Sequence, residues 1–152
     1  MRRVRLELKT PEQFRSMRAA GLVVQRTLAR LAEATAPGVT TAELDLLARD
    51  EIARAGATSS FLGYDAGYGL PPYPAVTCIS VNSEVVHGIP GPRVLKGGDL
   101  VSFDFGASIG GWHADSAITV TVGEVTPELE QLSAVTREAL WAGVAAVRSG
   151  GR

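Results

Sequence analysis

The sequence predicts an α+β fold in which helices cover an antiparallel sheet. Three observations predict it: two stretches with apolar residues at helical spacing open the chain, short β-type segments fill its middle, and a third helical stretch follows them. The 152 residues are 45% hydrophobic and 20% charged, which is typical of one ordinary globular domain.

The two leading helices are marked by their first residues. Residues 10–13 (Thr-Pro-Glu-Gln) and 40–43 (Thr-Thr-Ala-Glu) each place a capping Thr three positions before Gln or Glu, which is the pattern of a capping box. Residues 36–38 (Ala-Pro-Gly) end the first helix, and the second ends near Gly56. We therefore expect two antiparallel helices joined by a short Pro-Gly turn.

The middle of the chain alternates loops with β-type segments. Residues 59–74 are rich in Gly, Pro and Tyr and lack periodicity, so we expect a long surface loop; residues 82–99 are loop-rich as well. Residues 76–81 between them favour a short strand. The tyrosines of the first loop form either an aromatic rim around a ligand or a cover over the edge of the core: Tyr64, Tyr68 and Tyr73.

A β-hairpin and a helix complete the chain. Strands are expected over 100–107 and 112–122, and a third helix begins at Thr126. Its apolar residues recur every three to four positions: Leu129, Leu132, Val135, Leu140, Val144 and Val147. The closing residues 149–152 (Ser-Gly-Gly-Arg) favour a turn between two domains over a natural terminus.

Composition excludes several classes of function. A net charge of −1, from 15 basic and 16 acidic residues, argues against nucleic-acid binding and against an anionic membrane as partner. Cys78 is the single cysteine, so an intrachain disulfide is excluded. The basic start (residues 1–5) runs into charged rather than apolar residues, and no apolar stretch is long enough to span a bilayer. We expect a cytoplasmic protein without a signal peptide.

The hairpin carries a pair of carboxylates. Asp104 lies between Phe103 and Phe105, so strand alternation places it on the face opposite the two phenylalanines. If the turn centres on residues 109–110, Asp104 lies directly opposite Asp115. Two facing carboxylates repel each other, and a divalent metal ion removes that conflict. Alternatively the register differs, or both carboxylates are simply solvated.

Three further residues are candidates for the site. His113 shares the face of Asp115, opposite Gly106, where it either approaches a metal or serves as a structural hydrogen-bond partner. His87 lies in a loop bounded by Gly and Pro, where it either contacts a substrate carbonyl or is an ordinary loop residue. Cys78, in a β-type run, reads as a buried small hydrophobe and not as a nucleophile.

Four blocks of the sequence resemble type I methionine aminopeptidases, and the resemblance covers nearly the whole chain. They are residues 73–82 (Tyr-Pro-Ala-Val-Thr-Cys-Ile-Ser-Val-Asn), 85–90 (Val-Val-His-Gly-Ile-Pro), 98–104 (Gly-Asp-Leu-Val-Ser-Phe-Asp) and 111–115 (Gly-Trp-His-Ala-Asp). The resemblance implies the N-terminal half of a "pita-bread" fold. It also implies a metal-dependent hydrolase that removes the N-terminal initiator methionine from nascent polypeptides.

The resemblance also implies roles for individual residues. Asp104 and Asp115 would be metal ligands, the first bidentate and the second bridging two divalent ions. Co, Mn, Fe and Zn all accept carboxylate and imidazole ligands, so the sequence does not identify the metal. His87 would be catalytic and would contact the substrate near the scissile amide without binding metal. Tyr73 and Cys78 would line the pocket for the methionine side chain.

The sequence departs from the family after Asp115. The family's second half supplies one His and two Glu ligands, and none of the remaining residues matches them. We therefore expect residues 1–152 to form the N-terminal half of a catalytic domain, inactive alone and in need of a complementary C-terminal half. In addition, Pro71 and Pro72 replace a stretch that usually contains Gly.

Two other functions remain open. One is a non-catalytic, truncated pita-bread module that binds a partner protein or a chain terminus. The other is a related aminopeptidase or proline dipeptidase of the same fold. Retention of Asp104 and Asp115 favours the enzyme over the module, and the block with Tyr73 and Cys78 favours methionine over proline.

Overall fold

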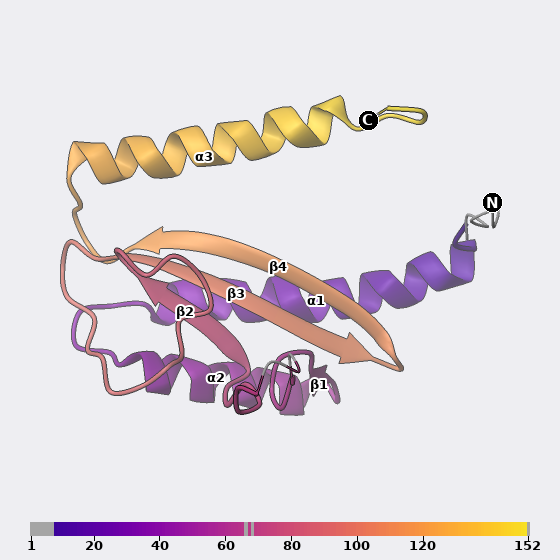
Figure 1. The fold of residues 1–152 in the computed structure, drawn as a ribbon, viewed down its shortest axis with the longest axis horizontal. Helices are drawn as coiled ribbons and strands as arrows, with labels where there is room; N and C mark the ends of the chain where they lie inside the picture. Colours follow the sequence, from indigo (N-terminus) through magenta and orange to yellow (C-terminus); the bar gives the residue numbers. More distant parts are fainter. Residues whose placement is uncertain (1–7, 66, 68, 152) are drawn as a thin grey trace.

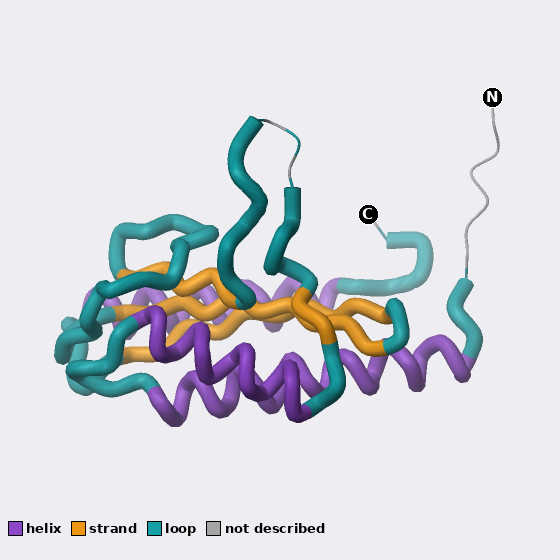
Figure 2. Tube along the Cα trace, turned by 90° about the horizontal axis from the view of Figure 1, so that it is seen from below, coloured by secondary structure: helices purple, strands orange, loops and turns teal. Residues whose placement is uncertain are grey.

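A computed structural model describes residues 8–65, 67 and 69–151, and it confirms an α+β fold with an antiparallel sheet. The elements in chain order are α1 (Pro11–Ala34), α2 (Thr41–Arg54), β1 (Thr58–Ser59), β2 (Thr77–Val81), β3 (Leu100–Ile109), β4 (Trp112–Thr121) and α3 (Pro127–Ala146). Helices α1 and α2 lie against one face of the sheet (Figures 1 and 2). The loop between β1 and β2 rises from the opposite face (Figure 2).

Both expected capping boxes are present. The Thr10 hydroxyl accepts from the Gln13 N–H, and the Gln13 side chain accepts from the Thr10 N–H at 2.8 Å. Thr40 and Glu43 repeat the arrangement at the start of α2. These local bonds satisfy N–H groups that the first helical turn leaves unpaired, which is why the start of each helix follows directly from the sequence.

Strand β3 lies at the centre of the sheet. It pairs with β4 along one edge and with β1 and β2 along the other, always antiparallel. The two-residue strand β1 lies where the sequence led us to expect the start of a loop. So short a strand carries no periodicity, and only its pairing with residues 107–108 of β3 defines it.

The register of the β3–β4 hairpin differs from the expected one by two residues. Gly110 and Gly111 have φ angles of 56° and 79°, and a two-residue hairpin turn with both φ positive needs its central positions there. Asp104 therefore pairs with Ala117, and Asp115 pairs with Gly106. The direct opposition of the two aspartates was wrong, but an even shift keeps both on the same face of the sheet.

The core fills the space between the sheet and the first two helices. Val101, Phe103 and Phe105 of β3 are fully buried there, as their alternation predicts. Complete burial of side chains of this size contributes about 1.5–3 kcal/mol each. The opposite face of β3, with Asp104, is thereby directed away from the helices.

A buried carboxylate ties α2 to the start of β2. Asp45 Oδ1 accepts hydrogen bonds from the Val76 N–H (2.9 Å), the Thr77 N–H (3.0 Å) and the Thr77 hydroxyl (2.8 Å). Asp45 Oδ2 forms an ion pair with Arg49 at 2.8 Å, and Arg49 also donates to the Pro74 carbonyl. This cluster fixes the point at which the long loop after β1 enters β2.

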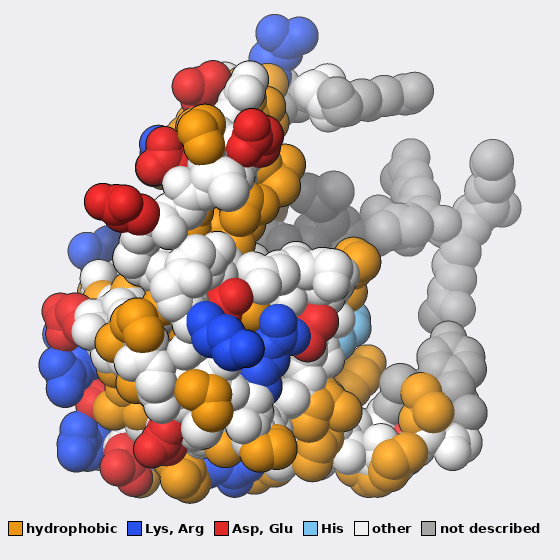
Figure 3. Space-filling view, turned by 90° about the vertical axis from the view of Figure 1, so that its left-hand side faces the viewer, with side chains coloured by type: hydrophobic (Ala, Val, Ile, Leu, Met, Phe, Trp, Pro, Cys, Tyr) orange, Lys and Arg blue, Asp and Glu red, His pale blue; other side chains and the backbone are white. Residues whose placement is uncertain are grey.

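Helix α3 confirms the third expected helix, but its apolar residues do not pack. None of its residues is buried, and Figures 1 and 3 show the helix standing apart from the sheet. The helix exposes large apolar side chains, as does the residue that follows it: Leu132, Val135, Leu140, Trp141 and Val144 in the helix, and Val147 after it. Within the described part of the chain, the outer edge of β4 is also unpaired. No helix among the residues described is long and apolar enough to cross a membrane.

Candidate metal and substrate site

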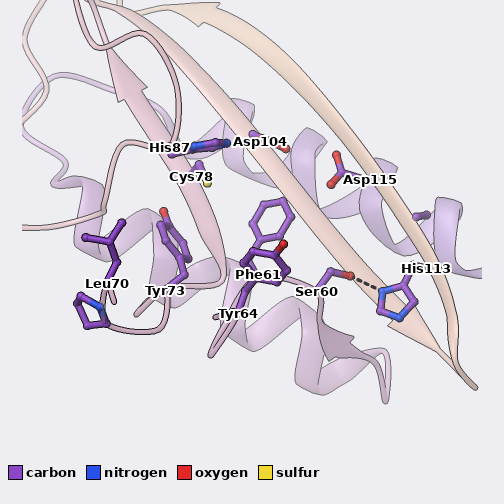
Figure 4. A pocket seen from close by; sticks show the side chains of 12 residues that line it. Ser60, Phe61, Tyr64, Leu70, Tyr73, Cys78, His87, Asp104, His113 and Asp115 are labelled. Atoms are coloured by element: carbon purple, nitrogen blue, oxygen red, sulfur yellow. Dashed lines mark hydrogen bonds between the residues drawn. The ribbon is translucent and has the colours of Figure 1, made fainter. Parts of the chain in front are cut away.

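The two aspartates lie on the sheet face that points away from α1 and α2. Asp104 is in the middle of β3, flanked in register by Cys78 of β2 and Ala117 of β4. Asp115 of β4 lies one diagonal step away, opposite Gly106. The shared face is as expected from the sequence, and Figure 4 shows both carboxylates over the same cavity.

One oxygen of the Asp104 carboxylate lacks a hydrogen-bond partner among the residues described. Its Oδ1 atom is buried and accepts no hydrogen bond from any residue that the structure describes. Burial raises the pKa of Asp104, the negative charge of Asp115 raises it further, and His87 lowers it to a smaller extent. A buried oxygen without a donor, beside a second carboxylate, is a site that a divalent cation fits, because hard cations prefer oxygen ligands.

Two carboxylates do not complete such a site. Among the residues described, no group of three or more His, Cys, Asp and Glu side chains is placed to hold a metal ion. His113 does not add to the set, because its Nδ1 lies 2.9 Å from the Ser60 hydroxyl, with which it shares a hydrogen bond. Of the two roles open for His113, the structure supports the structural one.

His87 is aimed at the aspartates by an unusual backbone. Its φ of 57° lies in the left-handed region, which residues other than glycine adopt rarely and mostly at functional sites. Figure 4 shows the imidazole above Cys78 and turned toward Asp104. The side chain is exposed to solvent, so it is accessible to a bound molecule.

A cavity of about 530 Å³ opens beside these residues. Both aspartates and His87 line it, together with aromatic and apolar groups: Phe61, Tyr64, Leu70, Pro71, Tyr73 and Cys78. Tyr64 and Tyr73 thus take the positions that an aromatic rim requires, whereas Tyr68 lies outside the described residues. A largely apolar wall with a few charged groups at one end is typical of a small-molecule or side-chain pocket.

Burial keeps Cys78 and Tyr73, two residues of the pocket wall, in their uncharged forms. Cys78 is only 5% exposed, and burial raises the pKa of its thiol, so the thiol is not a nucleophile at neutral pH. Burial also raises the pKa of the Tyr73 hydroxyl, with the neighbouring Cys78 adding to the effect. Both side chains therefore present uncharged surfaces to whatever enters the cavity.

Sequence reasoning missed the residues that bring the loop after β1 to the end of the cavity where the two aspartates lie. A Cβ atom at Gly106 would lie 2.8 Å from Phe61 Cε1, 3.0 Å from Ser60 Cβ and 3.3 Å from Asp115 Oδ2. Only glycine lets this loop pack so close to the strand. The sequence did contain a signal, because a glycine inside a strand indicates that another segment approaches the strand closely. It does not tell which segment this is.

The sequence of this chain matches a known family of metallopeptidases. Residues 15–152 match the model of metallopeptidase family M24, and the chain belongs to this family. It is 43% identical over 144 residues to methionine aminopeptidase 1 of Bacillus subtilis and 49% identical over 138 residues to methionine aminopeptidase 1 of Mycobacterium tuberculosis. These alignments cover 95% and 90% of this chain.

A solved structure confirms the expected architecture. The crystal structure of methionine aminopeptidase from Thermotoga maritima matches 95% of this chain with a TM-score of 0.86 and 34% sequence identity. The match covers 56% of that structure, and the chain spans about half the length of the curated relatives, 56% and 50% of the two named above. The fold is thus one half of the pita-bread arrangement that the resemblance implies.

Proposed function

We propose that residues 1–152 form the N-terminal half of the catalytic domain of a methionyl aminopeptidase, a metal-dependent hydrolase that removes the N-terminal methionine from nascent polypeptides. The observation that carries the proposal is the pair Asp104 and Asp115, directed to one cavity, with a buried Asp104 oxygen that lacks a partner. The names of the relatives support the substrate.

In this proposal Asp104 and Asp115 would be ligands of two divalent metal ions. When bound, such ions activate water and polarise a carbonyl near neutral pH. The chain's own residues do the rest. The cavity wall with Tyr73 and Cys78 receives an unbranched thioether side chain, to which neutral and soft groups are well suited. His87 hydrogen-bonds to the substrate near the scissile amide and orients it.

The remaining ligands come from a complementary C-terminal half, which supplies one His and two Glu. Two features of the described residues support this half. Helix α3 exposes its apolar side chains, and β4 offers an unpaired edge next to Asp115. Large exposed apolar surfaces and free strand edges mark places where another element packs.

The first test reads the source gene past the codon for Arg152 and measures the intact mass of the native product. A reading frame that continues with the missing His and two Glu supports the proposal. A stop codon with a matching mass leaves two ligands only, and the non-catalytic binding module then becomes the better reading.

The second test measures activity and metal content in the assembly of both halves. Release of methionine from a Met-Ala peptide is compared with release of leucine from a Leu-Ala peptide, and Mn²⁺ content is measured by mass spectrometry. Asp104→Asn should lose both activity and metal, whereas Cys78→Ser should keep the metal and lose selectivity for methionine. An Asp104→Asn variant with full activity and metal content contradicts the ligand assignment.

A further inference from the structure

We propose that the hydroxyl group of Tyr73 is a positioning group for His87, in addition to the place of its ring in the pocket wall. The inference rests on the proposed function, because it concerns how His87 is held for the substrate. The first observation is that the His87 imidazole makes no hydrogen bond in the described part of the chain. Its direction is therefore set by its own backbone and by the next residue, Gly88.

Gly88 is pressed against the outer edge of β2. A Cβ atom there would lie 2.2 Å from the Ile79 carbonyl oxygen, closer than any side chain allows. The Gly88 carbonyl accepts from the Ile79 N–H at 2.9 Å, and the Gly88 N–H donates to the Ser80 hydroxyl at 3.1 Å. The residue that follows His87 thus occupies the place of a neighbouring strand.

The Tyr73 hydroxyl adds a third bond to this residue. It donates to the Gly88 carbonyl at 3.1 Å and to the Thr77 carbonyl, at the start of β2, at 2.9 Å. One hydroxyl proton is therefore shared between the strand and the loop that carries His87. Figure 4 shows the Tyr73 oxygen on the side of the cavity where His87 lies.

Tyr73 is itself well held, so its hydroxyl is a fixed point. Its backbone exchanges hydrogen bonds with the other end of its loop, from the Gly63 N–H to the Tyr73 carbonyl (2.8 Å) and from the Tyr73 N–H to the Tyr64 carbonyl (2.9 Å). Its ring packs edge-to-face on Phe61 with centroids 6.5 Å apart. Tyr73 therefore helps to fix the orientation of Gly88, and with it that of His87, while its ring lines the pocket.

This arrangement predicts different effects for the ring and the hydroxyl. Tyr73→Phe keeps the ring, so the pocket and the KM for a Met-Ala peptide should stay within about twofold. The Ile79 bond still holds Gly88, so the loop stays folded, but His87 loses one constraint on its direction. Because displacements of the order of 1 Å near the reacting atoms lower rates up to about 100-fold, we expect kcat to fall about 10-fold.

Two further variants separate positioning from general damage. Thr35→Val is the matched control, because the Thr35 hydroxyl also donates to a backbone carbonyl, that of Leu31 at 2.7 Å, but does not line the cavity. It should leave kcat and KM unchanged. Ser80→Ala removes the other side-chain bond to Gly88 from outside the cavity, and it should lower kcat in the same way. It also keeps the proposal testable where Tyr73→Phe fails to fold.

The test combines a readout of His87 with the kinetics, both in the assembly of this chain with its C-terminal half. NMR of the His87 ring protons, recorded without metal or substrate, should show a changed shift or line width in Tyr73→Phe and Ser80→Ala but not in Thr35→Val. Unchanged His87 signals in both variants overturn the inference. So does a loosened His87 with an unchanged kcat, or a rise in KM alone. If His87 loosens but the parent assembly releases no methionine, the proposed function fails while the anchoring of His87 stands.

Discussion

The buried, unpaired oxygen of the Asp104 carboxylate should make the metal-free protein less stable than a variant in which this side chain is uncharged. Asp104 Oδ1 is buried and accepts no hydrogen bond from the described residues, and burial with the charge of Asp115 raises the pKa of Asp104. Asp104→Asn keeps the size of the side chain and removes its charge. A buried polar group without a partner costs about 1–3 kcal/mol, and more when charged. The side chain is half-buried and Asn retains an unpaired oxygen, so we expect a gain of only about 1 kcal/mol in the free energy of unfolding.

The pH dependence gives the same expectation with a definite sign. The folded pKa of Asp104 lies above its unfolded value, so the folded state binds more protons in the interval between the two. The stability of the parent should therefore fall, relative to Asp104→Asn, as the pH rises through that interval. The whole difference is present above the folded pKa of Asp104.

The assay is urea unfolding at pH 7, once with EDTA and once with excess Mn²⁺. With EDTA, Asp104→Asn should have the higher midpoint, and Mn²⁺ should stabilise the parent but not the variant. Asp50→Asn, at an exposed position of α2, serves as the control for loss of one negative charge. The reasoning is refuted if Asp104→Asn is less stable than the parent in EDTA, or if Mn²⁺ stabilises both equally.

Three other perturbations have expected outcomes. Asp45→Ala leaves the donors at the start of β2 unpaired and should lower the free energy of unfolding by about 3 kcal/mol; a loss below 1 kcal/mol in urea unfolding would contradict this. Gly106→Ala places a methyl group against Phe61 and should cost about 1–2 kcal/mol, whereas Gly21→Ala, a helical position with open space, should gain up to about 1 kcal/mol; equal midpoints for the two would argue against the packing. Burial acts to raise the pKa of Asp99, but the backbone N–H of its turn and a side-chain amide outweigh it and hold the pKa below the ordinary value. The stabilisation by Asp99 should thus be present above the unfolded pKa and lost as the pH falls through the folded one, and parent and Asp99→Asn should converge in acid.

Local chemistry made much of the fold predictable from the sequence. Thr10 and Thr40 cap their helices with residues three positions away, and the alternation around Phe103 sets the buried face of β3. The same alternation put Asp104 and Asp115 on one face without the correct register. The register depended on which two residues of the turn take positive φ, and the pair Gly110-Gly111 was the better guide.

Contacts between segments that lie far apart in the sequence could not be predicted from it. The loop after β1 has no periodicity, so nothing in its residues places Phe61 against Gly106 or Tyr73 against Gly88. The role of Asp45 was hidden for the same reason, because its partners lie more than thirty residues further along the chain, at separations of 31 and 32. The fold places the site residues that the resemblance implies around one cavity, while their chemical roles remain predictions.

Because Gly88 pairs with the outer edge of β2, this edge is closed to other chains, and this determines how copies of the protein would aggregate. Hydrogen bonds from Ile79 and Tyr73 use up the outer side of β2, so the sheet offers one long free edge, at β4, within the residues described. Two copies that join through β4 leave no further free edge of that length, so growth stops at a pair. A protein with two such edges would extend into fibres. When nothing else pairs with β4, overexpression should therefore give soluble dimers in light scattering, not fibrils that bind thioflavin.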